Sequence, residues 1–457
     1  MYQSFLCGAP GLRCALITLL LLVWSVGARA ATLEVGPGRA FDRLEAAVAA
    51  ARPGDEIRVH PLPGGGAYER VAVLVDKPRL SIRAAGVGAG ERVTLSGRGF
   101  VHSGRGRTPR AIVQFDPAAS DGVLAGFELT GASNATDNGA GVRINQANRV
   151  SIRDCDVHHN DIGIMSNGNG TLGSAAAQLI EHTAIHDNGD DRLPAFNHNL
   201  YLGGTSATLR FCEVRGARTG HNLKSRLHVL RVEYSYIHAS VNRELDLVDA
   251  AETAAPGSDV VLLGNVIVKS RTEPGNRGVI HFGQDGGRTH KGTLYLVHNT
   301  IVTPFVSPVV DLSSAGADAV LLGNIIDDGG RLRPNQVLGD GRRGGASATR
   351  ITGRRNRLAP GFASRLGDTG LSAADNEIAE QSQALFVAPQ QHDYRPRRPG
   401  PGIAAAGDAR LLADLPQTPG AAPGPPPLSR EYGHPLLERV RSVSRRPDLG
   451  AHAVVDR

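Results

Sequence analysis

The chain has few aromatic residues and few cysteines. Phe, Trp and Tyr make up 4% of its 457 residues, and only one Trp and four Cys are present. Glycine is abundant, with 57 residues. Few large core side chains and many tight turns argue against a helical bundle and are typical of a solenoid of short strands.

Long apolar runs are missing after residue 30. The one such run, Ala15–Val26, follows Arg13 and precedes Ala28-Arg29-Ala30, which has the A-x-A form of a cleavage site. This pattern predicts a secretory signal peptide over residues 1–30, with an uncleaved membrane anchor as the alternative. We therefore expect an exported protein, periplasmic or extracellular, without a membrane span after cleavage.

A strong excess of one charge is also missing. The formal net charge is +6, and it falls to +4 without residues 1–30, which hold two Arg and no acidic residue. A mild positive charge suits an acidic glycan, and no nucleic-acid-binding motif is present. The glycine-rich stretch 86–90 is not followed by a helix pattern, so it predicts a turn and not a nucleotide-binding loop.

A repeated strand phrase dominates residues 69–330. Its copies are VLAGFEL, SIRDCDV, LIEHTAI, LRFCEVR, RVEYSYI, LLGNVIV, LVHNTIV and LLGNIID. One residue near the middle of each copy aligns at steps of 23 to 34 residues: Gly126, Asp154, His182, Phe211, Tyr234, Asn265, Asn299 and Asn324. A variable period with many turns predicts a parallel β-helix, whose loops differ between rungs, and not a β-sandwich or a propeller.

The start of the chain predicts a cap for this solenoid. Phe41, Leu44 and Val48 recur at helical spacing within residues 41–51, between two strand patterns. A helix here would cover the open apolar end of the first rung. This passage resembles the opening of bacterial parallel β-helix proteins of the pectate-lyase-like superfamily.

The end of the chain carries a second resemblance. LFVAPQQHDYRPRRPGPGIAAAG, followed by RRPDLGAHA, resembles the closing segment of bacterial β-helix proteins. This resemblance implies an ordered tail packed near the C-terminal end. We predict an all-β monomer, a right-handed parallel β-helix with an N-terminal capping helix. Its predicted parts are a signal peptide (1–30), a cap and first rung (31–68), the β-helix (69–330), and C-terminal rungs with a closing segment (331–457).

A second strand in each repeat carries the candidate site. HNLYL (198–202), HNLKS (221–225) and RELDL (243–247) recur at steps of 23 and 22 residues. Alternation along a strand puts the central Leu of each phrase inward and Tyr201, Lys224 and Asp246 outward, with His281 continuing the column. The same parity predicts that Asn199, Asn222, Glu244 and Arg226 point outward and that Arg243 points inward. Because stacked strands lie about 4.8 Å apart, these side chains would form a polar stripe.

The stripe also carries a functional resemblance. GHNLKSR (220–226) resembles the Lys-Ser strand of polysaccharide lyases of the alginate lyase and chondroitinase B type. The resemblance implies that Lys224 is a general base and that an Arg on the next rung assists it. This chain has RELDL there, so Arg243 could take that place only by turning outward.

Lyase chemistry assigns further roles within the stripe. Cleaving a uronate-containing glycan by β-elimination requires a neutralised carboxylate, a base for the C5 proton and an acid for the leaving oxygen. Asn222, Arg226 or His221 could neutralise the carboxylate, and Tyr201 or His281 could be the acid. The remaining predicted substrate contacts are His198, Asn199, Arg243, Glu244 and Asp246. The same groups would make a C5-epimerase if the proton returned on the other face.

Three alternatives stay open at this point. Lys224 could instead form a structural ion pair with Glu244 or Asp246, which would stabilise its charged form. The protein could then be a non-catalytic glycan-binding or surface module. A glycoside hydrolase would use Glu244, Asp246 and Asp249 as its carboxylates.

Cysteines and acidic turns give two further predictions. Cys155 and Cys212 occupy equivalent positions two rungs apart, about 10 Å, so we expect unpaired, buried thiols. The segment His186–Asp191 clusters hard oxygen ligands and could bind Ca²⁺, although polar turn residues are the commoner explanation.

Overall fold

The computed structural model describes residues 30–454, apart from 87, 89–91, 191–195, 272–274, 288, 383, 398–401, 414, 418–419, 421–422 and 443. The predicted signal peptide therefore lies outside the described residues except for its last residue. No helix within the described part is long and apolar enough to cross a membrane.

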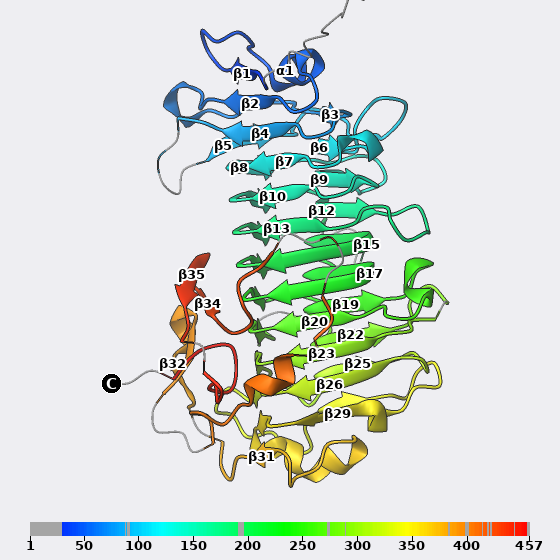
Figure 1. Ribbon diagram of the computed structural model, residues 1–457, viewed down its shortest axis with the longest axis vertical. Helices are drawn as coiled ribbons and strands as arrows, with labels where there is room; N and C mark the ends of the chain where they lie inside the picture. The colour runs from blue at the N-terminus through cyan, green and yellow to red at the C-terminus, as the bar shows by residue number, and fades with distance from the viewer. Residues whose placement is uncertain are drawn as a thin grey trace, which may run out of the picture.

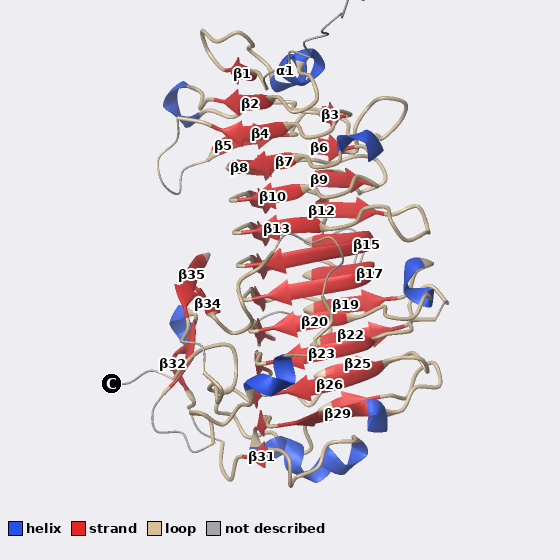
Figure 2. Cartoon of the chain, viewed as in Figure 1, coloured by secondary structure: helices blue, strands red, loops and turns tan. Residues whose placement is uncertain are grey.

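Three rows of parallel strands build the molecule, and each row runs along its long axis (Figures 1 and 2). Row 1 consists of β1 (Thr32–Val35), β2 (Glu56–Val59), β4 (Ser81–Ala84), β7 (Val123–Ala125), β10 (Ser151–Arg153), β13 (Gln178–Glu181), the second halves of β15 (Leu200–Arg210) and β17 (Leu223–Glu233), β20 (Val260–Leu263), β23 (Thr293–Val297), β26 (Asp318–Leu322) and β29 (Ile351–Arg354).

The other two rows complete each rung. Row 2 consists of β3 (Val73–Val75), β6 (Ala111–Phe115), β9 (Ala140–Asn145), β12 (Ile162–Asn167), the first halves of β15 and β17, β19 (Leu245–Val248), β22 (Ile280–Gly283), β25 (Val310–Leu312) and β28 (Gly339–Asp340). Row 3 consists of β5 (Val93–Ser96), β8 (Phe127–Thr130), β11 (Asp156–His158), β14 (Ala184–His186), β16 (Glu213–Arg215), β18 (Tyr236–His238), β21 (Val266–Val268), β24 (Thr300–Val302), β27 (Ile325–Asp327), β30 (Arg357–Leu358) and β31 (Glu377–Ile378). This is the right-handed parallel β-helix that the sequence predicts.

Stacked aliphatic side chains fill the interior of the solenoid. The predicted inward column of row 2 is confirmed, since Leu200, Leu223 and Leu245 pair in register and none is exposed. Burying each such side chain contributes roughly 1.5–3 kcal/mol, so the repeated column is a principal source of stability.

The corner between rows 1 and 3 needs a left-handed backbone. Asp154, Phe211 and Tyr234 have φ of 52°, 52° and 46° there, which few non-glycine residues adopt. The predicted alignment is correct for these residues but wrong by one position for Asn265 and its successors. Glu233 pairs with Leu263, which sets Gly264 opposite Tyr234.

The shifted asparagines have a distinct structural role. Asn265, Asn299, Asn324 and Asn356 stack as a buried ladder of side-chain amides that ends at Asn376. Each amide also accepts a backbone N–H from the preceding rung, as Asn299 does from Asn265 at 2.9 Å. The ladder thereby satisfies the polar groups that the corner would otherwise bury unpaired.

The N-terminal helix is shorter than the sequence predicts. α1 (Leu44–Ala50) lies at the N-terminal end of the solenoid and contacts β1, β2 and β3 (Figure 1). Leu44, Ala47 and Val48 face the core. Among the described residues, 3₁₀ segments occur outside the strands at Pro63–Gly65, Pro117–Ala119, Glu252–Ala254, Ala348–Arg350, Pro360–Asp368, Pro389–Gln391 and Ala409–Leu412.

The C-terminal tail does not pack where the sequence predicts. Parallel pairing continues past residue 330 to β31, and the tail then runs back beside the solenoid (Figure 1). It forms two antiparallel hairpins, β32 (Phe386–Ala388) with β33 (Asp393–Pro396) and β34 (Arg430–Gly433) with β35 (Leu437–Val440). Tyr394 and Tyr432 are buried with Tyr236 of row 3, so the tail covers the side of the solenoid.

Candidate functional site

Row 2 brings the predicted outward residues together. Tyr201 pairs with Lys224, Lys224 with Asp246, and Asp246 with His281, each on successive rungs. Asp311 continues the column beyond His281. Strand alternation therefore predicted the positions of these residues correctly.

Asp246 lies at the centre of a dense cluster of basic side chains. Its Oδ1 is 2.8 Å from His281 Nδ1 and 3.2 Å from Arg243 Nη1. Its Oδ2 is 3.3 Å from both Lys224 Nζ and His221 Nε2. Burial opposes its ionisation, yet the His281 hydrogen bond and the neighbouring cations hold the pKa of Asp246 well below its ordinary value. Asp246 is thus a buried anion that orients the groups around it.

His281 belongs to this buried network and does not face solvent. Its Nε2 is 2.6 Å from Ser313 Oγ, so Asp246, His281 and Ser313 have the connectivity of a Ser-His-Asp triad. Ser313 is only 1% exposed, however, and its Oγ also accepts the Gln284 N–H. His281 itself is 3% exposed, so the prediction that it protonates the leaving oxygen is wrong.

His198 and His221 stack on each other beneath the column. Their ring centroids are 5.1 Å apart, and burial lowers the pKa of His221 to about 4 and that of His198 well below its ordinary value. Both rings are therefore neutral at pH 7. His198 Nδ1 accepts the backbone N–H of His221. Because they are buried and neutral, they cannot neutralise a substrate carboxylate as the sequence predicts for His221.

The outward prediction is wrong for Asn199, Asn222 and Glu244. All three are 0% exposed. Asn199 Nδ2 donates to Asn222 Oδ1 at 2.8 Å, Asn222 Nδ2 donates to Glu244 Oε2 at 2.6 Å, and Lys269 Nζ lies 3.3 Å from Glu244 Oε1. Burial raises the pKa of Glu244 to about 7, against the effect of Lys269. These residues sit at the corner where row 3 turns into row 2, and strict alternation fails there.

The same corner turns Arg243 outward, opposite to its predicted parity. Its Nη2 reaches Asp311 Oδ2 at 3.3 Å, while Nη1 contacts Asp246. Arg243 also lines an open cleft of about 320 Å³, together with Arg342 and Arg343 from the loop after β28. The cleft extends the polar surface beyond the column.

Lys224 and Arg226 share one carboxylate that the sequence analysis missed. Asp285 Oδ2 accepts from Lys224 Nζ at 2.8 Å and from Arg226 Nη2 at 2.7 Å. Arg226 Nε also donates to the hydroxyl oxygen of Tyr201 at 3.0 Å. Asp249 Oδ1 fixes the loop that carries Asp285 by accepting its backbone N–H at 2.6 Å. Lys224 and Arg226 thus hold one partly exposed carboxylate, and Arg226 links it to Tyr201.

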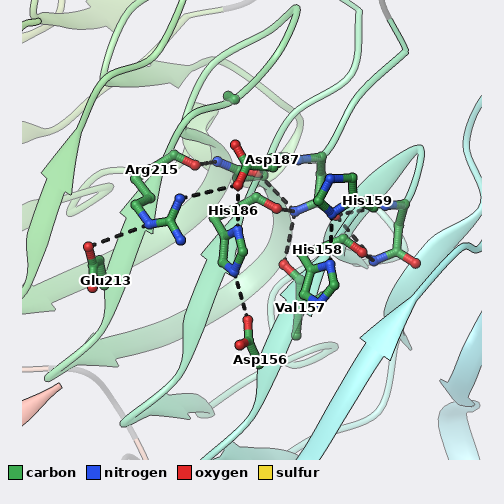
Figure 3. A network of polar contacts seen from close by, with 12 residues as sticks. Asp156, Val157, His158, His159, His186, Asp187, Glu213 and Arg215 are labelled. Atoms are coloured by element: carbon green, nitrogen blue, oxygen red, sulfur yellow. Dashed lines mark hydrogen bonds and ion pairs between the residues drawn. The ribbon is translucent and has the colours of Figure 1, made fainter. Parts of the chain in front are cut away.

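Row 3 carries a second polar network (Figure 3). His186 Nε2 lies 2.9 Å from Asp156 and Nδ1 lies 2.6 Å from Asp187. Arg215 Nη1 donates to Asp187 at 3.2 Å, and Arg215 Nε is 3.6 Å from Glu213. Burial acts to lower the pKa of His186, but the two carboxylates outweigh it and the pKa is raised.

This network bears on the calcium hypothesis. Asp187 is engaged by His186 and Arg215, and Asn188 belongs to the amide ladder that leads to Asn199. Asp191 lies outside the described residues. Across the described ranges, no three His, Cys, Asp or Glu side chains are grouped to hold a metal ion.

The predicted thiols are confirmed. Cys155 and Cys212 are free and buried. Burial raises the pKa of Cys155 to about 11 and that of Cys212 to about 12, so neither is a nucleophile at neutral pH.

Comparison with known proteins bears on the fold. No known family model matches the sequence, and no curated protein does. The structure is similar to that of pectate lyase Pel9A, with a TM-score of 0.50 and 12% identity over 93% of this chain and 97% of that chain. It is also similar to XylC, solved in complex with xylose, with a TM-score of 0.51 and 12% identity over 71% of this chain and 75% of that chain. At these identities the similarity establishes a shared parallel β-helix fold.

Proposed function

We propose that the protein is a carbohydrate-active enzyme of the exported β-helix type, a polysaccharide lyase that cleaves a uronate-containing glycan at Tyr201, Lys224 and Arg226. One observation carries the proposal. Lys224 and Arg226 hold the carboxylate of Asp285, and the same Arg226 guanidinium donates to the Tyr201 hydroxyl oxygen. A uronate carboxylate has the same charge and shape as the Asp285 carboxylate, and it would place the sugar ring against Tyr201.

The site supports a division of roles that differs from the sequence hypothesis. Lys224 forms ion pairs with Asp246 and Asp285. This arrangement suits a cation that binds a substrate carboxylate better than it suits a general base. We assign Lys224 and Arg226 to the substrate carboxylate, whose neutralisation makes the C5 proton removable. Tyr201 becomes the proton-transfer group, because its oxygen accepts from Arg226 and is partly exposed.

The chemistry then follows ordinary β-elimination. The phenolate oxygen of Tyr201 takes the C5 proton and becomes a neutral hydroxyl, the C5–H electron pair forms the C4–C5 double bond, and the C4–O bond breaks with its electron pair on the leaving oxygen. The leaving oxygen takes up a proton from Tyr201 or from water. Asp246 contributes by holding Lys224 in place.

The hydrolase alternative has little geometric support. Glu244 and Asp249 are 0% exposed and Asp246 is 3% exposed, so a scissile bond could not lie between them. A non-catalytic binding module could use the same carboxylate site. It would differ from a lyase only in that it binds the glycan without forming a product.

An incubation with purified pectate, alginate, glycosaminoglycans and bacterial exopolysaccharides separates these functions. A lyase produces the ultraviolet absorbance of an unsaturated uronide, and a hydrolase produces new reducing ends without it. An epimerase changes the sugar composition without cleavage. Binding without any product from the whole panel would support the module and contradict our proposal.

A further inference from the structure

A second cleft lies between row 3 and the C-terminal tail, on a different face from the Lys224 site. Its volume is about 670 Å³, within the roughly 300–1,000 Å³ typical of small-ligand sites. Tyr236, Val268 and Val302 of row 3 form one wall, and Phe386 and Tyr394 of the hairpin β32–β33 form the other. This hairpin stands beside the solenoid in Figure 1.

The base of the cleft is rigid and aromatic. Tyr236 stacks on His238 with centroids 3.9 Å apart and planes inclined by 15°. The Tyr236 hydroxyl is 2.9 Å from His392 Nδ1, and the Tyr394 ring centroid lies 5.8 Å from that of Tyr236. Apolar walls with a few fixed polar groups suit a pyranose ring, which has an apolar C–H face and polar edges.

Three arginines line the same cleft. Arg271, Arg331 and Arg397 are exposed, and within the described part of the chain no carboxylate lies in ion-pair distance of their guanidinium groups. Neighbouring arginines of the tail are paired, as Arg395 is with Asp393 at 2.6 Å and Arg430 is with Glu438. Arg397 Nη2 does donate to the Val387 carbonyl oxygen. Exposed guanidinium groups without a carboxylate partner among the described residues nevertheless favour a ligand that brings its own carboxylates.

The carboxylates in the cleft do not neutralise these arginines. Asp327 Oδ1 accepts the Gly329 N–H at 2.7 Å, and Asp328 Oδ1 accepts the Gly330 N–H at 2.9 Å. Both residues are buried. Burial also raises the pKa of Asp327 to about 6.

We propose that this cleft is a second glycan-binding site that takes a short anionic saccharide. The arginines would bind its carboxylates, and the apolar walls would pack against its sugar rings. The choice of a uronate rests on the proposed function, since the arginines alone specify an anion. Lys269 lies in this cleft and also contacts Glu244 below the Lys224 site, so the two sites occupy neighbouring faces of the same rungs. Two sites on one molecule would keep a polymeric substrate bound between cleavage events.

Calorimetry with hexamers of galacturonate, mannuronate and glucuronate tests the proposal, with cellohexaose as the neutral probe. The background is Lys224→Ala/Arg226→Ala, which disables the first site, and circular dichroism checks the fold of every variant. One triple variant removes the cleft arginines: Arg271→Ala/Arg331→Ala/Arg397→Ala. The matched control removes three exposed arginines elsewhere: Arg39→Ala/Arg70→Ala/Arg105→Ala.

We expect the background variant to retain one binding event for a hexauronate. The cleft triple variant should weaken this event at least about tenfold, and the control triple variant should leave it unchanged. Equal binding of cellohexaose, or no effect of the cleft variant, would overturn the proposal. If the wild type cleaves a uronan but the background variant binds no hexauronate, the second site alone would be overturned. If the background variant binds a hexauronate but the wild type cleaves no uronan, only the proposed lyase activity would be overturned.

Discussion

Asp285 occupies the position that we propose for the substrate carboxylate, so removing its side chain tests that position. In Asp285→Ala the Lys224 and Arg226 cations lose their internal partner, and an incoming uronate no longer competes with it. The variant keeps the backbone N–H groups of residue 285 and Gly286 that Asp249 Oδ1 holds at 2.6 Å each. The loop should therefore keep its place.

The magnitude follows from the exposure of the partners. The side chains of Lys224, Arg226 and Asp285 are 12%, 28% and 41% exposed, so their two ion pairs are partly screened by solvent. Such pairs are worth about 0.2–1 kcal/mol each, or up to about 2 kcal/mol together. Because about 1.4 kcal/mol is a tenfold change in affinity, uronate binding should tighten by roughly 2- to 30-fold.

Steady-state kinetics and calorimetry on the same uronan measure this effect. KM and Kd should fall, while kcat stays close to the wild-type value because Tyr201 is unchanged. Asp340→Ala is the matched control, since Asp340 lies in the same outward column and its nearest cation is Arg342 at 3.5 Å. Unchanged or weaker binding by Asp285→Ala would refute the idea that Asp285 fills the carboxylate site.

Three further predictions concern stability and reactivity. Asn299→Ala removes a rung of the buried amide ladder and should cost about 3–5 kcal/mol in urea unfolding, whereas Gln381→Ala, which truncates an exposed amide, should stay within about 0.5 kcal/mol; equal effects would refute a stabilising ladder. The raised pKa of His186 gives stability that is present below its ordinary pKa of about 6.5 and is lost as pH rises through the folded-state value, so His186→Gln should lower Tm more at pH 5.5 than at pH 8.5, and the opposite trend would contradict the network. A thiol reagent at pH 8 should leave Cys155 and Cys212 unmodified in the native protein and label both in denaturant, and rapid native labelling would show that these thiols are accessible.

Strand periodicity predicted most of the fold and the column of residues at the centre of the site. Alternation along HNLYL, HNLKS and RELDL placed Tyr201, Lys224 and Asp246 in one column because the three lie at equivalent positions within the paired strands β15, β17 and β19. The rule failed at the corner, where Asn199 and Glu244 turn into the buried ladder. The backbone changes direction there, so the alternation of inward and outward side chains along a strand no longer predicts which face a side chain occupies.

Contacts made by loops were beyond the reach of the sequence. Asp285 follows Lys224 by 61 residues and approaches it only because β22 stacks two rungs later on the same row. No spacing rule links Asp285 to Lys224. The turn Gln284-Asp285-Gly286-Gly287 at the end of a strand of the site could have marked Asp285 as a candidate site residue. The unexpected path of the tail has the same origin, since a Pro-rich composition does not encode which side of a solenoid it covers.

Product formation by the wild type and two variants tests the central claim most directly. On the uronan that the panel identifies, the wild type should generate an unsaturated uronide, followed by its ultraviolet absorbance. Tyr201→Phe should lose this activity by at least about 100-fold while still binding the polymer at the Lys224 site, and Lys224→Ala should lose both the activity and the binding event of that site. Wild-type turnover that persists in Tyr201→Phe, or binding of every uronan without any unsaturated product, would contradict the account.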